Sequence, residues 1–118
     1  MPTPFVWFDV TTRNTAEVQS FYADLLGWPV VPAENAGAYT AWIMDGQQPW
    51  GGVVATEDAT SGRWLPYARV DDLDVATEKA TKLGATVVQG QTEGPAGTAV
   101  TIADPGGALL ALWVPRAE

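Results

Sequence analysis

The period of the hydrophobic pattern changes several times along the chain, and each change predicts a new element. Residues 5–11, "FVWFDVT", alternate with period two and are rich in aromatic and β-branched side chains, which is typical of a strand. In residues 14–27 apolar side chains recur at helical spacing, between an Asn-x-x-Glu start signal and a glycine stop. The predicted strand faces are Phe5, Trp7 and Asp9 on one side and Val6, Phe8 and Val10, which look like core, on the other.

The same order of elements occurs twice. Residues 28–37, 38–46 and 49–57 read as three strands that follow the helix. After a polar stretch the pattern restarts with a strand over 64–71, a helix over 72–84, and strands over 86–91, 97–104 and 108–114. The chain is therefore predicted to be α+β, with two tandem βαβββ modules: module 1 over about 4–57, a linker over about 58–63 and module 2 over about 64–115.

Glycine pairs and helix starts add local detail to this pattern. Asp72 is placed to cap the second helix, and Gly106-Gly107 reads as a hairpin turn. Gly51-Gly52 reads as a pair of small residues that relieves crowding at a strand edge. Neither glycine pair matches a phosphate-binding loop.

The composition limits the classes of partner that the protein is expected to bind. The chain has 118 residues, which suits one domain, and a formal net charge of −8 with only six Lys and Arg, which argues against nucleic acid. No apolar run approaches the length of a membrane span, so no membrane partner is expected. The start of the chain lacks the pattern of a secretory signal, and a cytoplasmic location is expected. The chain has no Cys and no His, which removes thiolate and imidazole ligands and a Ser-His triad.

The duplication and three segments, "FYADLLGW", "VDDLDVATEKATKLGA" and "DPGGALLALW", together resemble the vicinal oxygen chelate superfamily of glyoxalases, bleomycin-resistance proteins and extradiol dioxygenases. The resemblance covers nearly the whole chain. It implies that the two modules form a curved, mixed sheet shaped like a cup, with the helices outside. The concave face of such a cup holds a metal ion or a ligand.

The metal positions of that superfamily can be carried over by register. They fall on Trp7, Gly52, Leu65 and Ala111, whose side chains cannot bind a divalent cation. We therefore expect neither a metal nor another cofactor.

Aromatic and apolar side chains take the place of those ligands. Rings that line a pocket suit a flat, conjugated molecule, although the same rings are also typical of a core. Period-two alternation predicts these residues for the concave face: Phe5, Trp7, Leu65, Tyr67, Leu109, Ala111 and Trp113, with Trp42 and Trp50 as less secure additions.

Asp9 and Arg69 hold equivalent places in the two modules and are expected to approach one another. Such a pair is usually structural, but it also offers an acceptor and a planar donor fork to a polar group of a ligand.

These observations support two hypotheses of different functional class, and a third that they favour less. The first is metal-independent binding of an aromatic or conjugated natural product, which protects the host by sequestration as in antibiotic self-resistance; the resemblance implies a homodimer. The second is a cofactor-free biosynthetic enzyme, such as an isomerase, cyclase or hydrolytic enzyme, with Asp9 as general base and Arg69 or Tyr67 stabilising negative charge. The third is a metalloenzyme that uses other acids. The acids considered for it are Glu34, Asp45 and Glu93.

Overall fold

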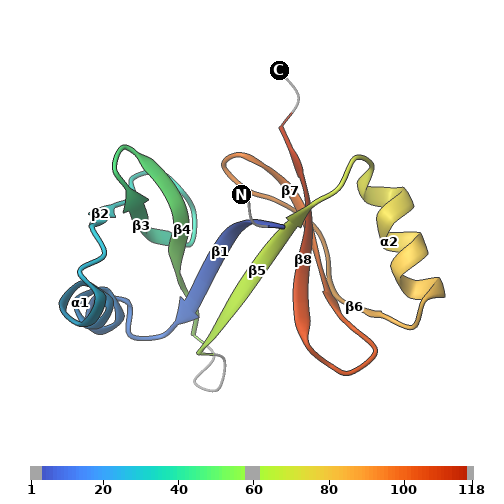
Figure 1. Cartoon of the computed structure of the whole chain (residues 1–118), viewed down its shortest axis with the longest axis horizontal. Coiled ribbons are helices and arrows are strands. Elements are labelled where there is room, and N and C mark those ends of the chain that lie inside the picture. Colours follow the sequence, from blue (N-terminus) through green and yellow to red (C-terminus); the bar gives the residue numbers. More distant parts are fainter. Residues whose placement is uncertain (1–3, 58–61, 117–118) are drawn as a thin grey trace. The chain divides into compact units, whose positions relative to one another are not determined.

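The computed structural model describes residues 4–57 and 62–116 and confirms the α+β class and the repeated order of elements (Figure 1). The elements are β1 (Phe5–Thr12), α1 (Thr15–Leu26), β2 (Val30–Pro32), β3 (Tyr39–Asp45), β4 (Gln48–Ala55), β5 (Arg63–Arg69), α2 (Leu73–Lys82), β6 (Thr86–Glu93), β7 (Gly97–Ala103) and β8 (Leu109–Pro115). Of the predicted linker 58–63, residues 58–61 lie outside the described residues, and Arg63 already belongs to β5.

The chain divides into two compact units. The first unit is Trp7–Leu65, and the second contains the chain from Pro66 onward together with its start, through Val6. In the first unit β4 lies between β3, to which it is antiparallel, and β1, to which it is parallel. In the second unit β8 lies in the same way between β7, which is antiparallel, and β5, which is parallel. Both units therefore carry a small mixed sheet of the same topology, as a duplication predicts.

The core of the first unit lies between its sheet and α1. Its buried side chains are Val10, Ala41, Ile43 and Val53, and the half-buried Tyr22 of α1 packs against them. α1 ends as predicted at Gly27, which has φ 71° and donates its N–H to the carbonyl of Ala23. The predicted cap at its start is wrong in one respect, because the side chain of Asn14 makes no capping hydrogen bond.

The core of the second unit lies between α2 and the strands β6, β7 and β8, which α2 contacts (Figure 1). Asp72 caps α2 as predicted, since its side chain accepts a hydrogen bond from the N–H of Val75 at 3.0 Å. Leu73 is buried in the core, but Leu83 lies beyond the last helical residue and is 69% exposed. The hairpin turn at Gly106-Gly107 is confirmed, and Asp104 Oδ1 accepts the N–H of Gly106.

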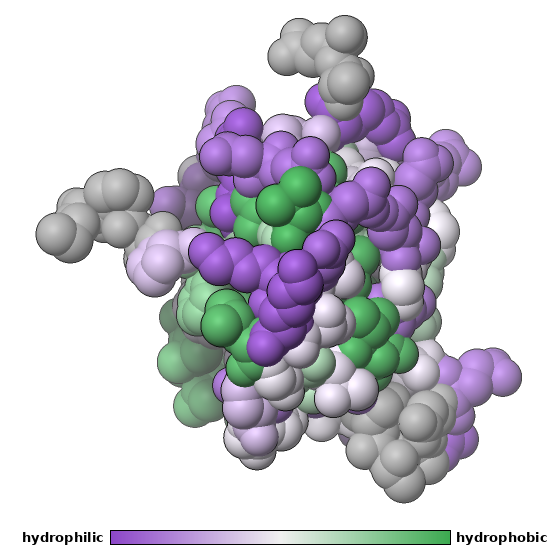
Figure 2. Space-filling model, turned by 90° about the vertical axis from the view of Figure 1, so that its right-hand side faces the viewer, coloured by the Kyte–Doolittle hydropathy of each residue, from purple (hydrophilic) through white to green (hydrophobic). Residues whose placement is uncertain are grey.

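The outer surface of the second unit is polar around α2, with separate hydrophobic spots (Figure 2). Lys82 and Glu78 form an exposed ion pair there, and the exposed side chain of Val75 lies beside them. Among the described residues, no helix has the length and apolar character needed to span a membrane.

Candidate functional site

A buried carboxyl group organises the face of the first unit that lies opposite α1. Asp9 is only 4% exposed, although it is charged in its usual form. Its Oδ1 accepts the indole N–H of Trp7 at 2.7 Å, and the hydroxyl of Tyr39 donates to Oδ1 and Oδ2 at 2.7 and 2.9 Å. Hydrogen bonds from neutral donors to a carboxylate favour its ionised form and offset part of its desolvation. Asp9 thus fixes two aromatic rings by their polar ends.

Three rings form one cluster around this carboxyl group, and we call Trp7, Tyr39 and Trp42 the ring cluster. Tyr39 and Trp42 lie 4.8 Å apart between centroids, and Trp7 meets each of them edge to face at 6.5 and 6.0 Å. All three side chains are half-buried, so each keeps part of its surface open. Such edge-to-face contacts hold the rings in fixed orientations.

The backbone explains why these side chains meet. Asp9 of β1 and Trp42 of β3 are both register partners of Gly52 in β4, so all three positions share one rung and one face. The register between β3 and β4 shifts at Thr40, where β3 carries an extra residue. This bulge turns Tyr39 to the same face as Trp42, three residues away, which regular alternation forbids.

Gly52 makes room for the ring of Tyr39. A Cβ at this position would lie 2.6 Å from Cδ1 of Tyr39 and closer still to its Cε1. The earlier interpretation of Gly51-Gly52 as strand-edge relief is wrong, because β4 is an interior strand with neighbours on both sides. Gly51 faces a similar limit, since its added Cβ would lie 2.7 Å from the carbonyl oxygen of Phe8.

Trp50 does not join the ring cluster, contrary to the sequence expectation. A second bulge in β4 leaves Trp50 as the extra residue between the pairs Ile43↔Gly51 and Met44↔Pro49. Its side chain is thereby turned to the α1 side, where its ring lies 4.8 Å from that of Trp28. Trp50 is a core residue here.

The remaining predicted residues are distributed between the two units. In the second unit Tyr67 pairs in register with Ala111, and Arg69 with Trp113, so the four positions share the face opposite α2. Ala111 is fully buried, whereas Arg69 is exposed. The pairing of Arg69 with Asp9 stays a prediction, as does a concave surface that both units line together.

Three predicted residues lie apart from these pairs. Leu109 shares the face of Ala111 and Trp113 by alternation along β8, and is half-buried. Leu65 is buried at 8% exposure in β5, and Phe5 is 37% exposed at the start of β1. Their contribution to a ligand site stays a prediction.

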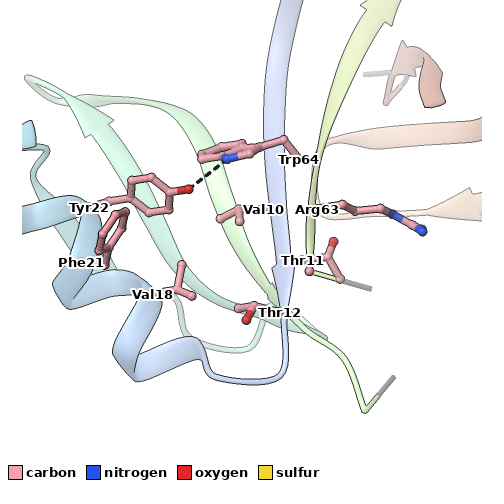
Figure 3. A pocket seen from close by; sticks show the side chains of 9 residues that line it. Val10, Thr11, Thr12, Val18, Phe21, Tyr22, Arg63 and Trp64 are labelled. Atoms are coloured by element: carbon pink, nitrogen blue, oxygen red, sulfur yellow. Dashed lines mark hydrogen bonds between the residues drawn. The ribbon is translucent and has the colours of Figure 1, made fainter. Parts of the chain in front are cut away.

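A shallow hollow of about 230 Å³ lies on the α1 side of the first unit (Figure 3). Its walls include Tyr22 and Trp64, whose indole N–H donates to the Tyr22 hydroxyl at 3.0 Å. Arg63 points away from the other lining side chains in Figure 3, and the hydroxyl of Thr12 already accepts the N–H of Asn14. The hollow therefore offers a ligand few polar contacts, and the ring cluster is the better candidate site.

The residues present do not fit the divalent cation of the superfamily. Trp7 turns its N–H toward Asp9, the ring of Tyr39 covers Gly52, and Leu65 and Ala111 carry only apolar side chains. Within residues 4–57 and 62–116 no three His, Cys, Asp or Glu side chains gather closely enough to hold a metal. Among the described residues of the first unit, Asp9 is the carboxylate that contacts the ring cluster, and one carboxylate is too few for such a site.

Sequence reasoning missed Tyr39. Its place beside Trp42 depends on the bulge at Thr40, which period-two alternation does not reveal. The available signal was Gly52, because a glycine inside a strand often marks a close approach by another group.

Known proteins of solved structure share the fold of this chain. Methylmalonyl-CoA epimerase from Mycobacterium tuberculosis is 18% identical, with a TM-score of 0.66, and the match covers 99% of this chain and 94% of that one. The Mn(II)-bound glyoxalase from Novosphingobium aromaticivorans is 17% identical with a TM-score of 0.66, over 98% of this chain and 42% of that one. The H200E variant of homoprotocatechuate 2,3-dioxygenase from B. fuscum is 16% identical with a TM-score of 0.66, over 97% of this chain and 32% of that one. A comparison with the sequences of curated proteins finds no match.

The family assignment depends on a sequence model, because structural likeness at these identities shows the fold alone. The model described as "Glyoxalase-like domain" matches residues 6–113, which is most of the chain. This chain therefore belongs to the glyoxalase-like domain family of the vicinal oxygen chelate superfamily, as the resemblance predicted.

Proposed function

We propose that this protein binds a flat aromatic or conjugated small molecule on the ring cluster and releases it unchanged. The observation that carries the proposal is the hydrogen-bonded anchoring of Trp7 and Tyr39 on one buried carboxyl group, with Trp42 beside them. Three half-buried rings on the face opposite the helix give an aromatic ligand a surface on which to stack.

The energetics favour binding of an aromatic ligand. Each well-placed aromatic contact adds about 0.5–1.5 kcal/mol beyond the area that it buries. Because Asp9 holds two of the rings in place before binding, little side-chain entropy is lost when the ligand arrives. A rigid aromatic surface is therefore well suited to hold a bound ligand.

The biological role we propose is sequestration of an aromatic natural product, as in antibiotic self-resistance. The superfamily resemblance, which includes the bleomycin-resistance proteins, supports this role and a homodimer with two equivalent sites. The lack of a secretory-signal pattern supports a cytoplasmic location. Under this proposal no cofactor takes part.

The test is a fluorescence titration of the natural protein with planar antibiotics such as an anthracycline and a tetracycline, followed by recovery of the ligand. We expect saturable quenching of Trp emission and a recovered ligand of unchanged mass. Trp42→Leu is expected to weaken binding about two- to tenfold, whereas the matched change Trp64→Leu on the α1 side leaves the affinity of the folded protein unaltered. A chemically altered ligand would contradict the proposal.

A second function, a cofactor-free enzyme with Asp9 as general base, is supported by one observation. The Tyr39 hydroxyl is shared by both oxygens of Asp9, so a proton can move between a phenol and a carboxylate next to a bound ligand. Asp9→Asn distinguishes the two functions. Conversion that is lost while binding is retained supports the enzyme, and absence of conversion in both forms supports the binder.

A further inference from the structure

We infer that the ligand of the ring cluster is a neutral, flat aromatic molecule with a hydrogen-bond acceptor in the plane of its rings, such as a carbonyl oxygen or a ring nitrogen. The indole N–H of Trp42 donates to this acceptor. This inference rests on the proposed function and names the class of molecule that the site selects.

The first step concerns the hydrogen-bond donors of the ring cluster. A tryptophan has one side-chain N–H and a tyrosine has one O–H. Trp7 and Tyr39 both donate these groups to Asp9, at 2.7 Å. Within residues 4–57 and 62–116, no group accepts the indole N–H of Trp42. Trp42 therefore carries the side-chain donor of the ring cluster that a ligand can still use.

The second step concerns the access of a ligand to this N–H. The side chain of Trp42 is half-buried. In the part of the chain that the structure describes, every buried side-chain nitrogen or oxygen of a residue that is not exposed has a hydrogen-bond partner. Because the N–H of Trp42 has none, its nitrogen is not a buried atom and is open to water. It lies on a surface that a ligand can reach.

The third step concerns the position of the indole ring. Trp42 lies in β3, an interior strand between β2 and β4. Its ring packs against that of Tyr39, with centroids 4.8 Å apart, and meets Trp7 edge to face at 6.0 Å. The direction of its N–H is therefore set before a ligand arrives, and a hydrogen bond to it costs little side-chain entropy.

The fourth step concerns selectivity. A ligand that covers Trp42 displaces water from its N–H, and a donor that loses water without gaining an acceptor is penalised. A ligand with an acceptor in its ring plane replaces the lost hydrogen bond, whereas a hydrocarbon of the same shape does not. The formal net charge of −8 disfavours an anionic acceptor such as a carboxylate, so the acceptor is a neutral one.

The experiment compares quinoline, kept neutral at pH 8, with naphthalene, which has the same two-ring frame and no acceptor. Affinities are measured by titration for the natural protein and for Trp42→Phe, which keeps a ring and removes the N–H. We expect the ratio of the quinoline affinity to the naphthalene affinity to fall about two- to tenfold in Trp42→Phe. The ratio is compared because it cancels the difference in hydration between the two probes.

Trp7→Phe is the matched control, because the N–H of Trp7 is already donated to Asp9, and it should leave this ratio unchanged. A second measurement uses the natural protein, in proton–nitrogen correlation spectra with assigned indole signals. Saturation with quinoline should move the N–H signal of Trp42 downfield of its position with naphthalene, and the signal of Trp7 should show no such difference. This measurement decides the inference if Trp42→Phe does not fold.

An unchanged ratio in folded Trp42→Phe, or the same position of the Trp42 signal with both probes, overturns the inference. It leaves the proposed function standing, because both probes still bind. A ratio that falls as far in Trp7→Phe as in Trp42→Phe has the same consequence. If neither probe binds to protein whose fold is verified by circular dichroism, the proposed function fails as well.

Discussion

A carboxyl group as deeply buried as that of Asp9 needs hydrogen-bond donors, because an unsatisfied buried charge costs several kcal/mol. Trp7 and Tyr39 supply them from β1 and β3. The same bonds that stabilise the carboxylate also orient two rings, so at this position stability and the shape of the candidate site depend on the same contacts.

Tyr39→Phe keeps the ring and removes the hydroxyl that Asp9 accepts. We expect a loss of about 1–3 kcal/mol in the free energy of unfolding, which is the usual cost of removing one partner of a hydrogen bond to a charged group. Urea unfolding of the variant and the natural protein measures this loss. A Tyr39→Phe protein as stable as the natural one would show that the hydroxyl contributes nothing to burying Asp9.

Gly52→Ala tests the close approach of Tyr39 to β4. The added Cβ overlaps the ring of Tyr39, and we expect destabilisation of about 1–3 kcal/mol. The penalty should largely disappear in a Tyr39→Ala background, because the two changes share one contact. Gly90→Ala in β6 is the control, since an added Cβ there meets nothing within 4 Å. Additive effects of Gly52→Ala and Tyr39→Ala would argue against this packing.

At the scale of elements, two bulges decide which side chains the sheet of the first unit turns to each face. The one at Thr40 brings Tyr39 to the ring cluster, and the one at Trp50 sends that indole to the core beside α1. On the α1 side Trp28 and Trp64 contact its ring and Tyr22 contacts both of them, with centroids 4.8–6.3 Å apart. Local shifts in strand register thus assign Trp50 to a packing role and Tyr39 to the candidate site.

The two helices differ in how they begin. Asp72→Ala removes a capping hydrogen bond from the start of α2, and we expect it to lower stability by about 1 kcal/mol. Asn14→Ala at the start of α1 removes no such bond and should change stability by much less. Thermal unfolding of the two variants side by side measures the difference, and equal losses would mean that Asn14 also caps its helix in solution.

At the scale of the whole molecule, the duplicated topology supplies the superfamily's framework, and Trp7, Gly52, Leu65 and Ala111 stand at the positions predicted for its metal ligands. Addition of Mn²⁺ or Zn²⁺ to protein purified without a histidine tag is expected to leave the melting temperature unchanged, because a ligand stabilises a folded protein only if it binds to it. Differential scanning calorimetry provides the measurement. A rise in melting temperature that EDTA reverses would instead support the third function, a metalloenzyme that uses acids such as Glu34, Asp45 and Glu93.

The charge of the molecule also belongs to this scale. A formal net charge of −8 on 118 residues favours solubility and disfavours anionic partners.

Sequence pattern was sufficient for the α+β class, the two modules, both helices and the superfamily, because each depends on periodicity and on stop signals such as Gly27 that act locally. It also placed Trp7 and Asp9 together on one strand face, since alternation along a regular strand is reliable. The role of Tyr39 and the inward position of Trp50 required the three-dimensional structure. Both result from bulges in the pairing of β3 with β4, and a bulge is set by contacts between strands that residue spacing along one strand does not encode.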